Sequence, residues 1–395
     1  MRTPLRSHRS MHTVLHLTLV AAAAGCGGDD GGGPSPSGAQ IGQVSLISAG
    51  DHSTCVTNDL QEGFCWGANS DGQLGDGTHE TRVVAVPVSG GFSFSSISAG
   101  DHACGITLDG EEVCWGKGSS GELGNGTTSS SAVPVSISGD FTFEQIGIGS
   151  SSCGFRFAAE VYCWGPNDSG QLGTGDFTDR DTPAVVAGGI VFARFGMGSR
   201  TACGSTSDGT AYCWGNGNDG ELGNGSFGVM SEAPVPVAGG LQFGDFSVGG
   251  SPDGAATVCG GAADSQTYCW GSNTHGQLGD GTTQRRNVPG VVGAALHLSG
   301  VVVGRTHACG RGPGAKAYCW GAGGLLGNGT TASSLSPALV AGNLVFATLT
   351  AGAEHTCGRT DDTDEMYCWG ANDFGQLGDG TTTRRLIPVK VLGQS

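Results

Sequence analysis

Short apolar segments alternate with polar, glycine-rich segments along residues 41–391. One kind of apolar segment is strand-length and ends in glycine: 46–50, 96–100, 145–149, 194–198, 245–249, 301–304 and 348–352. Another kind carries proline: 86–88, 133–135, 182–186, 233–237, 288–292, 336–340 and 387–391. Apolar runs of this length, bounded by turn-forming residues, predict short β-strands. Proline is tolerated at the edge of a sheet, so the proline-bearing segments are expected to be outermost strands.

A tryptophan-containing block sets the period of this pattern. Residues 65–78 read CWGANSDGQLGDGT, and similar blocks lie at 114–127, 163–176, 213–226, 269–282, 319–330 and 368–381. The copy at 319–330 is two residues shorter than the others, and all seven tryptophans lie in these blocks. Their spacing is 49 to 56 residues. A fixed period near fifty residues indicates a repeat architecture.

A second cysteine precedes each block by ten residues, or by eleven in the last copy. The pairs are Cys55 with Cys65, Cys104 with Cys114, Cys153 with Cys163, Cys203 with Cys213, Cys259 with Cys269, Cys309 with Cys319, and Cys357 with Cys368. Two strands joined by a tight turn place such residues nearly opposite each other, close enough for a disulfide. The sequence therefore predicts one disulfide per repeat, each adding about 3 kcal/mol of stability in the chain-entropy model.

Each repeat thus supplies four short strands, and the seven repeats predict an all-β fold. The first repeat begins at Ile41 without a proline-bearing strand before it, and the last repeat ends just after such a strand. In a closed ring, the segment 387–391 is expected to complete the sheet begun by residues 41–50. Closure would cover the two faces that an open array leaves exposed.

Metal binding is the alternative for the cysteines. His52, His102, His307 and His355 lie near the first cysteine of their repeats, but three repeats have no such histidine. A zinc site of four ligands per repeat cannot be completed. The histidines are expected to be core residues that bond to the backbone of a neighbouring repeat. The Asp or Asn that follows six of the seven turns, at positions 76, 125, 224, 280, 328 and 379, supplies too few oxygens for calcium and is expected to bond its own turn. No metal or cofactor is predicted.

The first residues are predicted to be an export signal. Three arginines precede an apolar run from Val14 to Ala24, and Cys26 follows small residues. This ending resembles a bacterial lipoprotein signal. The resemblance implies that residues 1–25 are the signal peptide and that Cys26 becomes the lipid-bearing first residue of the mature chain. An ordinary secretion signal is the alternative. Residues 26–40 are then a flexible linker, and residues 41–395 form the repeat domain. The expected location is the cell envelope or the extracellular space.

Net charge excludes some classes of partner. The chain of 395 residues carries −17, and beyond residue 25 it has 15 basic against 35 acidic residues, or −20. A chain this acidic repels nucleic acids and anionic lipids. The largest basic clusters, 285–286 and 384–385, are arginine pairs that are expected to balance nearby acids. We therefore expect no nucleic-acid partner, and membrane contact only through the N-terminal lipid.

The pattern AG-x-x-H-x-C … CWG-x-N-x-x-GQLG-x-GT … P-x-V resembles the regulator of chromosome condensation repeat family, over residues 41–391. The resemblance implies a seven-bladed β-propeller. In that arrangement each tryptophan would pack between neighbouring blades, and Leu74 and its equivalents would fill the same pocket.

The expected function is non-catalytic protein binding by a monomer with an unknown partner. No set of catalytic residues stands apart from the repeat consensus, and propeller loops suit recognition. A sharper form is enzyme inhibition, since a secreted β-lactamase inhibitor with a similar repeat fold uses one propeller face. Two further hypotheses are a propeller-type lyase or hydrolase and guanine-nucleotide exchange. The resemblance implies the exchange activity, but the expected compartment opposes it.

Loops that break the repeat are the candidate binding sites. Segment 250–258 contains Asp253, segment 226–232 contains Phe227 and Met230, and segment 176–181 contains Phe177 and Arg180. Aromatic, methionine and arginine side chains in loops are typical anchors of protein interfaces. The alternative is that the aromatic side chains fold back onto a blade.

Overall fold

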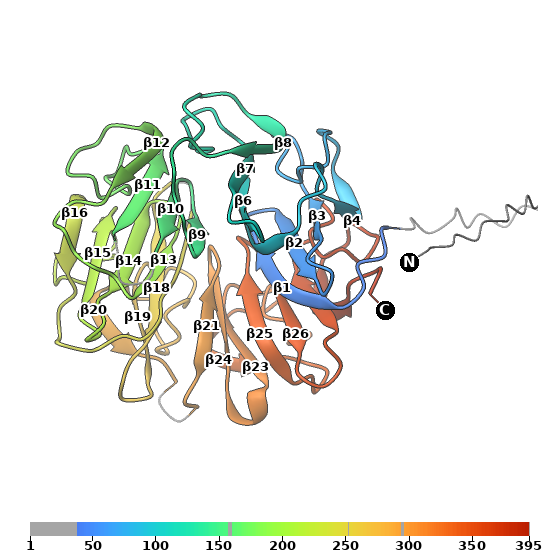
Figure 1. The fold of residues 1–395 in the computed structure, drawn as a ribbon. Helices are drawn as coiled ribbons and strands as arrows, with labels where there is room; N and C mark the ends of the chain where they lie inside the picture. Colours follow the sequence, from blue (N-terminus) through green and yellow to red (C-terminus); the bar gives the residue numbers. More distant parts are fainter. Residues whose placement is uncertain (1–37, 157–159, 252, 294–295, 395) are drawn as a thin grey trace, which may run out of the picture. The chain divides into compact units, whose positions relative to one another are not determined.

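The computed structural model describes residues 38–156, 160–251, 253–293 and 296–394. The expected signal peptide (1–25) and Cys26 lie outside the described residues, and so does the expected linker 26–40 except for its last three residues. The described residues form 28 strands in seven four-stranded antiparallel sheets, arranged as blades around a ring (Figure 1). The all-β, seven-bladed prediction is confirmed.

Each blade consists of four strands that are consecutive in the sequence. The first, innermost strands are β1 (Val44–Ala49), β5 (Phe94–Ala99), β9 (Gln145–Ile148), β13 (Arg194–Met197), β17 (Ser247–Gly250), β21 (Ser299–Val303) and β25 (Phe346–Ala351). The second strands are β2 (Ser53–Asn58), β6 (His102–Thr107), β10 (Ser152–Phe155), β14 (Thr201–Ser205), β18 (Ala256–Gly261), β22 (His307–Arg311) and β26 (His355–Thr360).

The third strands are β3 (Gly63–Gly67), β7 (Glu112–Gly116), β11 (Val161–Gly165), β15 (Ala211–Gly215), β19 (Thr267–Gly271), β23 (Ala317–Gly321) and β27 (Met366–Gly370). The fourth strands are β4 (Arg82–Pro87), β8 (Ser131–Ser136), β12 (Arg180–Val185), β16 (Ser231–Pro236), β20 (Arg286–Val291), β24 (Ser334–Leu339) and β28 (Arg385–Lys390). The fourth strands carry the prolines and lie at the outer edge of each sheet, as predicted.

A disulfide joins the second and third strands of every blade, and all seven predicted pairs are confirmed. The bonds join Cys55 to Cys65, Cys104 to Cys114, Cys153 to Cys163, Cys203 to Cys213, Cys259 to Cys269, Cys309 to Cys319, and Cys357 to Cys368. In each blade the two cysteines stand directly opposite each other, with Cα atoms 4.1 Å apart in the first blade. All fourteen are almost completely buried. Each disulfide therefore links the centres of two strands that are neighbours in the sequence and already pair as a hairpin.

Tryptophans fill the seams between neighbouring blades. All seven are fully buried, and six donate their indole N–H to a backbone carbonyl of the preceding blade. Trp115, for example, donates to the carbonyl of Gln73 at 3.0 Å. Gly75, in the same GQLG turn, has φ of 69°, and a Cβ there would lie 2.7 Å from the Trp115 Nε1. The turn of one blade therefore needs glycine because the tryptophan of the next blade packs on it.

Buried histidines also cross the seams, but they bond to hydroxyl groups and not to backbone, so that detail of the prediction was wrong. His355 Nε2 lies 2.9 Å from Thr54 Oγ1, and this hydroxyl donates to the carbonyl of Gln376. His102 and Ser152 repeat the arrangement at another seam. Because the hydroxyl proton is already given to the carbonyl, the imidazole must donate through Nε2.

His52 departs from this pattern. It lies three residues before its cysteine, whereas the buried histidines lie two residues before theirs. Its side chain is only partly buried, and its ring lies 4.9 Å from the ring of Phe374. The prediction of a core position was therefore wrong for His52.

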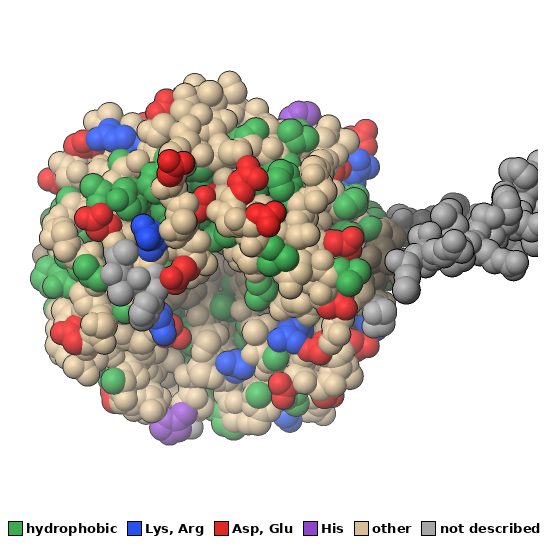
Figure 2. Space-filling view, in the orientation of Figure 1, with side chains coloured by type: hydrophobic (Ala, Val, Ile, Leu, Met, Phe, Trp, Pro, Cys, Tyr) green, Lys and Arg blue, Asp and Glu red, His purple; other side chains and the backbone are tan. Residues whose placement is uncertain are grey.

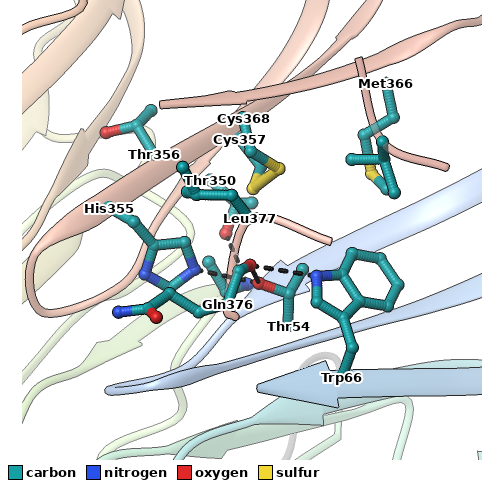
Figure 3. Close-up of a disulfide and its surroundings, with 12 residues drawn as sticks. Thr54, Trp66, Thr350, His355, Thr356, Cys357, Met366, Cys368, Gln376 and Leu377 are labelled. Atoms are coloured by element: carbon teal, nitrogen blue, oxygen red, sulfur yellow. Dashed lines mark hydrogen bonds between the residues drawn. A yellow bond between two sulfur atoms is a disulfide. The ribbon is translucent and has the colours of Figure 1, made fainter. Parts of the chain in front are cut away.

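The ring closes through packing and hydrogen bonds between the first and seventh blades, not through the shared sheet that the sequence suggested. β28 pairs with β27, and β1 pairs with β2, so the prediction that 387–391 completes the sheet of 41–50 was wrong. At the closing seam, Trp66 and Thr54 both donate to the carbonyl of Gln376 (Figure 3). Short local connections favour pairing between consecutive strands, and these keep every blade continuous in sequence.

In the described residues, the structure has no helix with the length and apolar character for a membrane crossing.

Candidate functional site: the loop face

Each blade sends two loops to one side of the ring. The first and third strands of a blade run in the same direction, because both are antiparallel to the second. The loops after the first and third strands therefore emerge on one face, which we call the loop face. The turns between second and third strands, such as residues 59–62, emerge on the opposite hairpin face. The segments 176–181, 226–232 and 250–258 all belong to the loop face.

The loop after the third strand is held by its own polar side chains. In the first blade the buried Asn69 accepts a bond from the N–H of Leu74 and donates to the carbonyl of Thr78. Asp76 accepts from the N–H of Thr78 and pairs with Arg82 at 3.1 Å. The prediction that this Asp bonds its own turn is confirmed. The network fixes the loop, so it presents a rigid outer surface.

A carboxylate–arginine pair recurs in four of the seven blades, with Asp176 two positions later in its block than the other carboxylates: Asp76–Arg82, Asp176–Arg180, Asp280–Arg286 and Asp379–Arg385. The other three blades have Ser131, Ser231 and Ser334 at the arginine position, and Asn125, Asn224 and Asn328 in the turn. The two versions alternate from the first to the seventh blade. The sequence analysis missed this alternation, although comparing the seven blocks position by position would have revealed it.

Three predicted anchors are exposed on the loop face. Phe177, Phe227 and Met230 have exposed fractions of 47%, 42% and 49%. The alternative, in which the aromatic side chains fold back onto a blade, therefore does not describe Phe177 or Phe227. Val229, between Phe227 and Met230, is exposed as well and was not predicted. Exposed apolar side chains gathered in one loop are typical of an interaction site.

Arg285 supports Phe227 from the neighbouring blade. Its guanidinium carbon lies 4.7 Å from the centre of the Phe227 ring, and its Nη1 lies 2.7 Å from Asp219 Oδ1. The expectation that Arg285 balances an acid is confirmed, but its stacking on Phe227 was missed. A cation over an aromatic face stabilises the pair and holds the ring in a defined orientation.

The other two predicted residues have different surroundings. Arg180 is paired with Asp176 at 2.6 Å and also donates to the carbonyl of Thr178, so its charge is largely engaged within its own loop. Asp253 is exposed in the loop after β17, and a hydrogen bond from Ser251 lowers the pKa of its carboxyl. The structure therefore places all five predicted residues on one face, in three separate segments: Phe177 with Arg180, Phe227 with Met230, and Asp253 alone.

Acidic and basic residues meet where the loop face opens into the ring. A cavity of 440 Å³ follows the axis, and its lining includes Asp51, Asp101, Lys117, Glu122 and Arg305. Figure 2 shows the ring from one side, with a hollow at its centre and charged side chains of both signs scattered over the surface. Burial and, next, the neighbouring Asp101 raise the pKa of Asp51. Carboxylates are therefore crowded at this opening.

A buried carboxylate lies in two of the turns. Glu122 and Glu221 stand where four other blades have glutamine, and each accepts the N–H of the residue two positions earlier. Burial raises the pKa of Glu221 to about 7. In the part of the chain that the structure describes, neither carboxylate bonds to a nucleophilic side chain or a histidine, and both accept N–H groups of their own turns.

Comparison with protein-family models gives a match over more than half of the chain. One model, described as the regulator of chromosome condensation (RCC1) repeat, matches residues 64–106, 109–155, 159–206, 264–310 and 363–395. A second model with the same description matches residues 193–221 and 346–376. The match 64–106 runs from β3 of one blade to β6 of the next, so the sequence repeat spans a seam and is offset from the blade.

Solved structures with the same fold include human WBSCR16, at 19% identity over 84% of this chain and 93% of that chain, with a TM-score of 0.74. The yeast RCC1 protein Prp20, in a structure with Kap60 bound, is 17% identical over 98% and 91%, with a TM-score of 0.73. The ectodomain of the Arabidopsis thaliana receptor kinase ACR4 is 20% identical over 89% and 100%, with a TM-score of 0.52. At these identities the likeness concerns the fold alone.

Proposed function

This chain belongs to the regulator of chromosome condensation (RCC1) repeat family, and on that premise we propose that it is a non-catalytic scaffold that binds a protein partner through its loop face. The observation that carries the proposal is the grouping of exposed anchors on this face. Phe177, Phe227, Val229 and Met230 are exposed there, and Arg285 holds the Phe227 ring from the adjacent blade. Rigid aromatic side chains backed by a fixed scaffold lose little entropy on binding.

Protein binding also has support from structures of the same fold. The yeast protein Prp20 is described with binding properties to Gsp1p and histones, and in another structure with Kap60 bound. Those partners belong to Prp20 and are not transferred to this chain. What supports the proposal is that a ring of this fold can serve as a protein-binding surface. The net charge of −17 favours partners with basic surfaces and disfavours nucleic acids.

The proposed place of action is outside the cytoplasm, with the chain attached to a membrane through a lipid on Cys26. The basic and apolar start of the sequence supports export. Seven buried disulfides, one per blade, support an oxidising compartment because cytosolic thiols are kept reduced. Mass spectrometry of the mature protein tests this: a diacylglyceryl group on an N-terminal Cys26 is expected, and an unprocessed Met1 would contradict it.

Affinity capture from extracts of the source cells tests the binding surface. The full chain is compared with a loop-face variant, Phe177→Ala/Phe227→Ala/Met230→Ala. We expect the loop-face variant to lose at least tenfold of the captured partner, because each deleted anchor removes about 1–2 kcal/mol of interface energy.

A matched control removes apolar side chains from the other face. Leu60→Ala/Leu108→Ala changes two residues of the hairpin face that are 69% and 59% exposed, and it should retain the partner. A partner that is lost with the control but kept by the loop-face variant would contradict the proposal, and so would capture that never rises above an unrelated propeller.

A further inference from the structure

The axial cavity has apolar walls and a charged opening. Its 440 Å³ are lined by residues from all seven innermost strands or the loops that follow them. Ile148, Phe195, Met197, Val248 and Val303 contribute apolar side chains to the wall. A volume of this size accommodates a small molecule or one inserted side chain. Its walls suit an aliphatic chain.

The opening holds more acidic than basic side chains, and most of the acids are loosely paired. Asp51, Asp101, Glu122 and Asp168 line it together with Lys117, Arg200 and Arg305, so acids outnumber bases by four to three. Away from the axis, ion pairs such as Arg385–Asp379 are short, at 2.6 Å.

At the opening, Arg200 lies 3.2 Å from Asp168, but the other contacts are longer. Arg305 lies 3.9 Å from Asp51 and 3.8 Å from Glu354, and Lys117 lies 3.8 Å from Glu122. The carboxylate of Asp101 has no hydrogen bond or ion pair within the described residues, and it stands beside Asp51. The loops that carry these two residues touch, since a Cβ on Gly50 would lie 2.6 Å from the Gly100 nitrogen. Two neighbouring carboxylates with one distant arginine leave room for another cation.

Glu122 gives an independent sign of a missing hydrogen-bond donor. This residue is 1% exposed and lines the cavity, yet its Oε1 has no hydrogen-bond partner among the described residues, and the Lys117 Nζ that faces it stays 3.8 Å away. Its other oxygen accepts the N–H of Ser120. A buried carboxylate oxygen without a donor is costly, so an ammonium group that donated to it would be stabilised.

The chemistry of the site favours an organic cation over a metal ion. In the described part of the chain, no three His, Cys, Asp or Glu side chains gather as metal ligands do. Hard cations need six or more oxygen ligands, whereas an ammonium group needs only two or three acceptors. From the crowded carboxylates, the donor-free oxygen of Glu122 and the apolar walls, we infer that the axial opening binds a primary alkyl-ammonium group on an aliphatic stem.

Two sources offer this chemistry: the lysine side chain of a protein and a free aliphatic diamine. In either case the ammonium lies between Asp51 and Asp101 or at Glu122, and the methylene stem contacts the apolar wall. The opening lies at the centre of the loop face, so a lysine could enter it from a bound partner. The inference does not depend on the proposed protein-binding function, because small amines test it without any partner.

Calorimetric titration of the full chain with two amines is the experiment. The probes are Nα-acetyl-lysine methylamide and 1,5-diaminopentane, and the controls are Nα-acetyl-norleucine methylamide and 1-pentanol, which keep the stem without the charge. We expect an amine to bind saturably, one to one, with a dissociation constant of about 1 mM or tighter. The two controls should show no binding. Tighter binding of the lysine derivative assigns the site to a protein side chain, and tighter binding of the diamine assigns it to a free metabolite.

Three variants locate the binding. Asp101→Asn and Glu122→Gln should each weaken it about tenfold or more, because one charge-assisted bond is lost. Glu122→Gln should fold, since glutamine stands at the equivalent position in four other blades. Glu80→Gln, at an exposed position on the same face, should bind as the unchanged chain does. Amine binding that is absent, equal to that of pentanol, or unchanged in the Asp101→Asn/Glu122→Gln chain would overturn the inference.

Discussion

At the scale of single residues, the seams between blades contain hydrogen bonds from a buried histidine to a hydroxyl group and from that hydroxyl to a backbone carbonyl. The sequence indicated them only in part. The position of the histidine before the cysteine predicted a core residue in contact with the next blade, and that is what His102, His307 and His355 are. The hydroxyl partner could not be predicted, because it lies about 50 residues or about 300 residues away in the chain. Only the folded ring brings the two side chains together.

These histidines make the fold sensitive to mild acid. Burial lowers their pKa values, to about 3 for His102 and His355 and about 4 for His307, and among the described residues Nδ1 has no hydrogen-bond partner in any of the three. The unfolded chain takes up these protons near pH 6.5, whereas the folded chain does not, so stability falls as the pH drops below 6.5. At pH 4.5 the expected loss is about 2–3 kcal/mol for each histidine, from two pH units at 1.36 kcal/mol each.

Denaturant unfolding at pH 7.5 and pH 4.5 measures this loss. His355→Gln should reduce the acid loss by about 2–3 kcal/mol, since it removes one of the three buried histidines, while the exposed His275→Gln should not change it. The comparison cancels the opposite effect of Glu221, whose pKa burial raises to about 7, because both chains carry it. An acid loss that is equal in His355→Gln and in the unchanged chain would contradict the account.

Residue identity alone could not show which candidate side chains are available to a partner. Phe227 and Met230 were predicted as anchors because they are apolar side chains in a polar loop, and both are exposed. Arg180 was predicted on the same reasoning, but its guanidinium is held by Asp176. Arg285 was expected only to balance an acid, yet it also stacks on Phe227. Charged side chains reach several groups, so their partners depend on geometry that the sequence does not contain.

At the scale of elements, the strands and disulfides could be predicted because each depends on local sequence. A hairpin with paired cysteines ten residues apart fixes the register of its two strands, and the structure has Cys203 opposite Cys213 as expected. The way the ring closes depends on residues that are far apart in the sequence. It is set by where each blade begins and ends within the repeating sequence unit. The period of the sequence is the same for every choice of boundary, so the predicted sharing of a sheet between 387–391 and 41–50 was wrong.

The short sixth block has a structural consequence in the next blade. In the other six seams the tryptophan N–H donates to a carbonyl of the preceding GQLG-type turn, but Trp369 Nε1, which faces the short block, has no partner in the described residues. Trp66 and Trp369 are both fully buried. They therefore form a natural pair that differs in one hydrogen bond.

Replacing each of the two tryptophans by phenylalanine measures that bond. Trp66→Phe should destabilise the protein by about 1 kcal/mol more than Trp369→Phe, because only Trp66 loses an N–H···O bond while both changes remove the same indole surface. The free energies come from denaturant unfolding with unchanged slopes. Equal costs would show that the acceptor at Gln376 contributes nothing measurable to the seam.

At the scale of the whole molecule, the residues that hold the blades together are different from the residues proposed to bind a partner. The seams are built from recurring tryptophan, leucine and glycine, which makes the blades nearly equivalent. The loop face carries the deviations from the repeat, including the exposed segment 226–232 and the axial opening. The sequence could predict the ring because repetition made its signal strong. It could not predict the axial opening, because that site combines single residues from separate blades.

The central claim is that the loop face contacts the partner, and site-specific photo-crosslinking in living source cells tests it most directly. A photoreactive phenylalanine analogue replaces Phe227 on the loop face or Leu108 on the hairpin face in otherwise unchanged chains. The account predicts that position 227 gives a discrete crosslinked protein band and that position 108 does not. A band from position 108 with none from position 227 would contradict it.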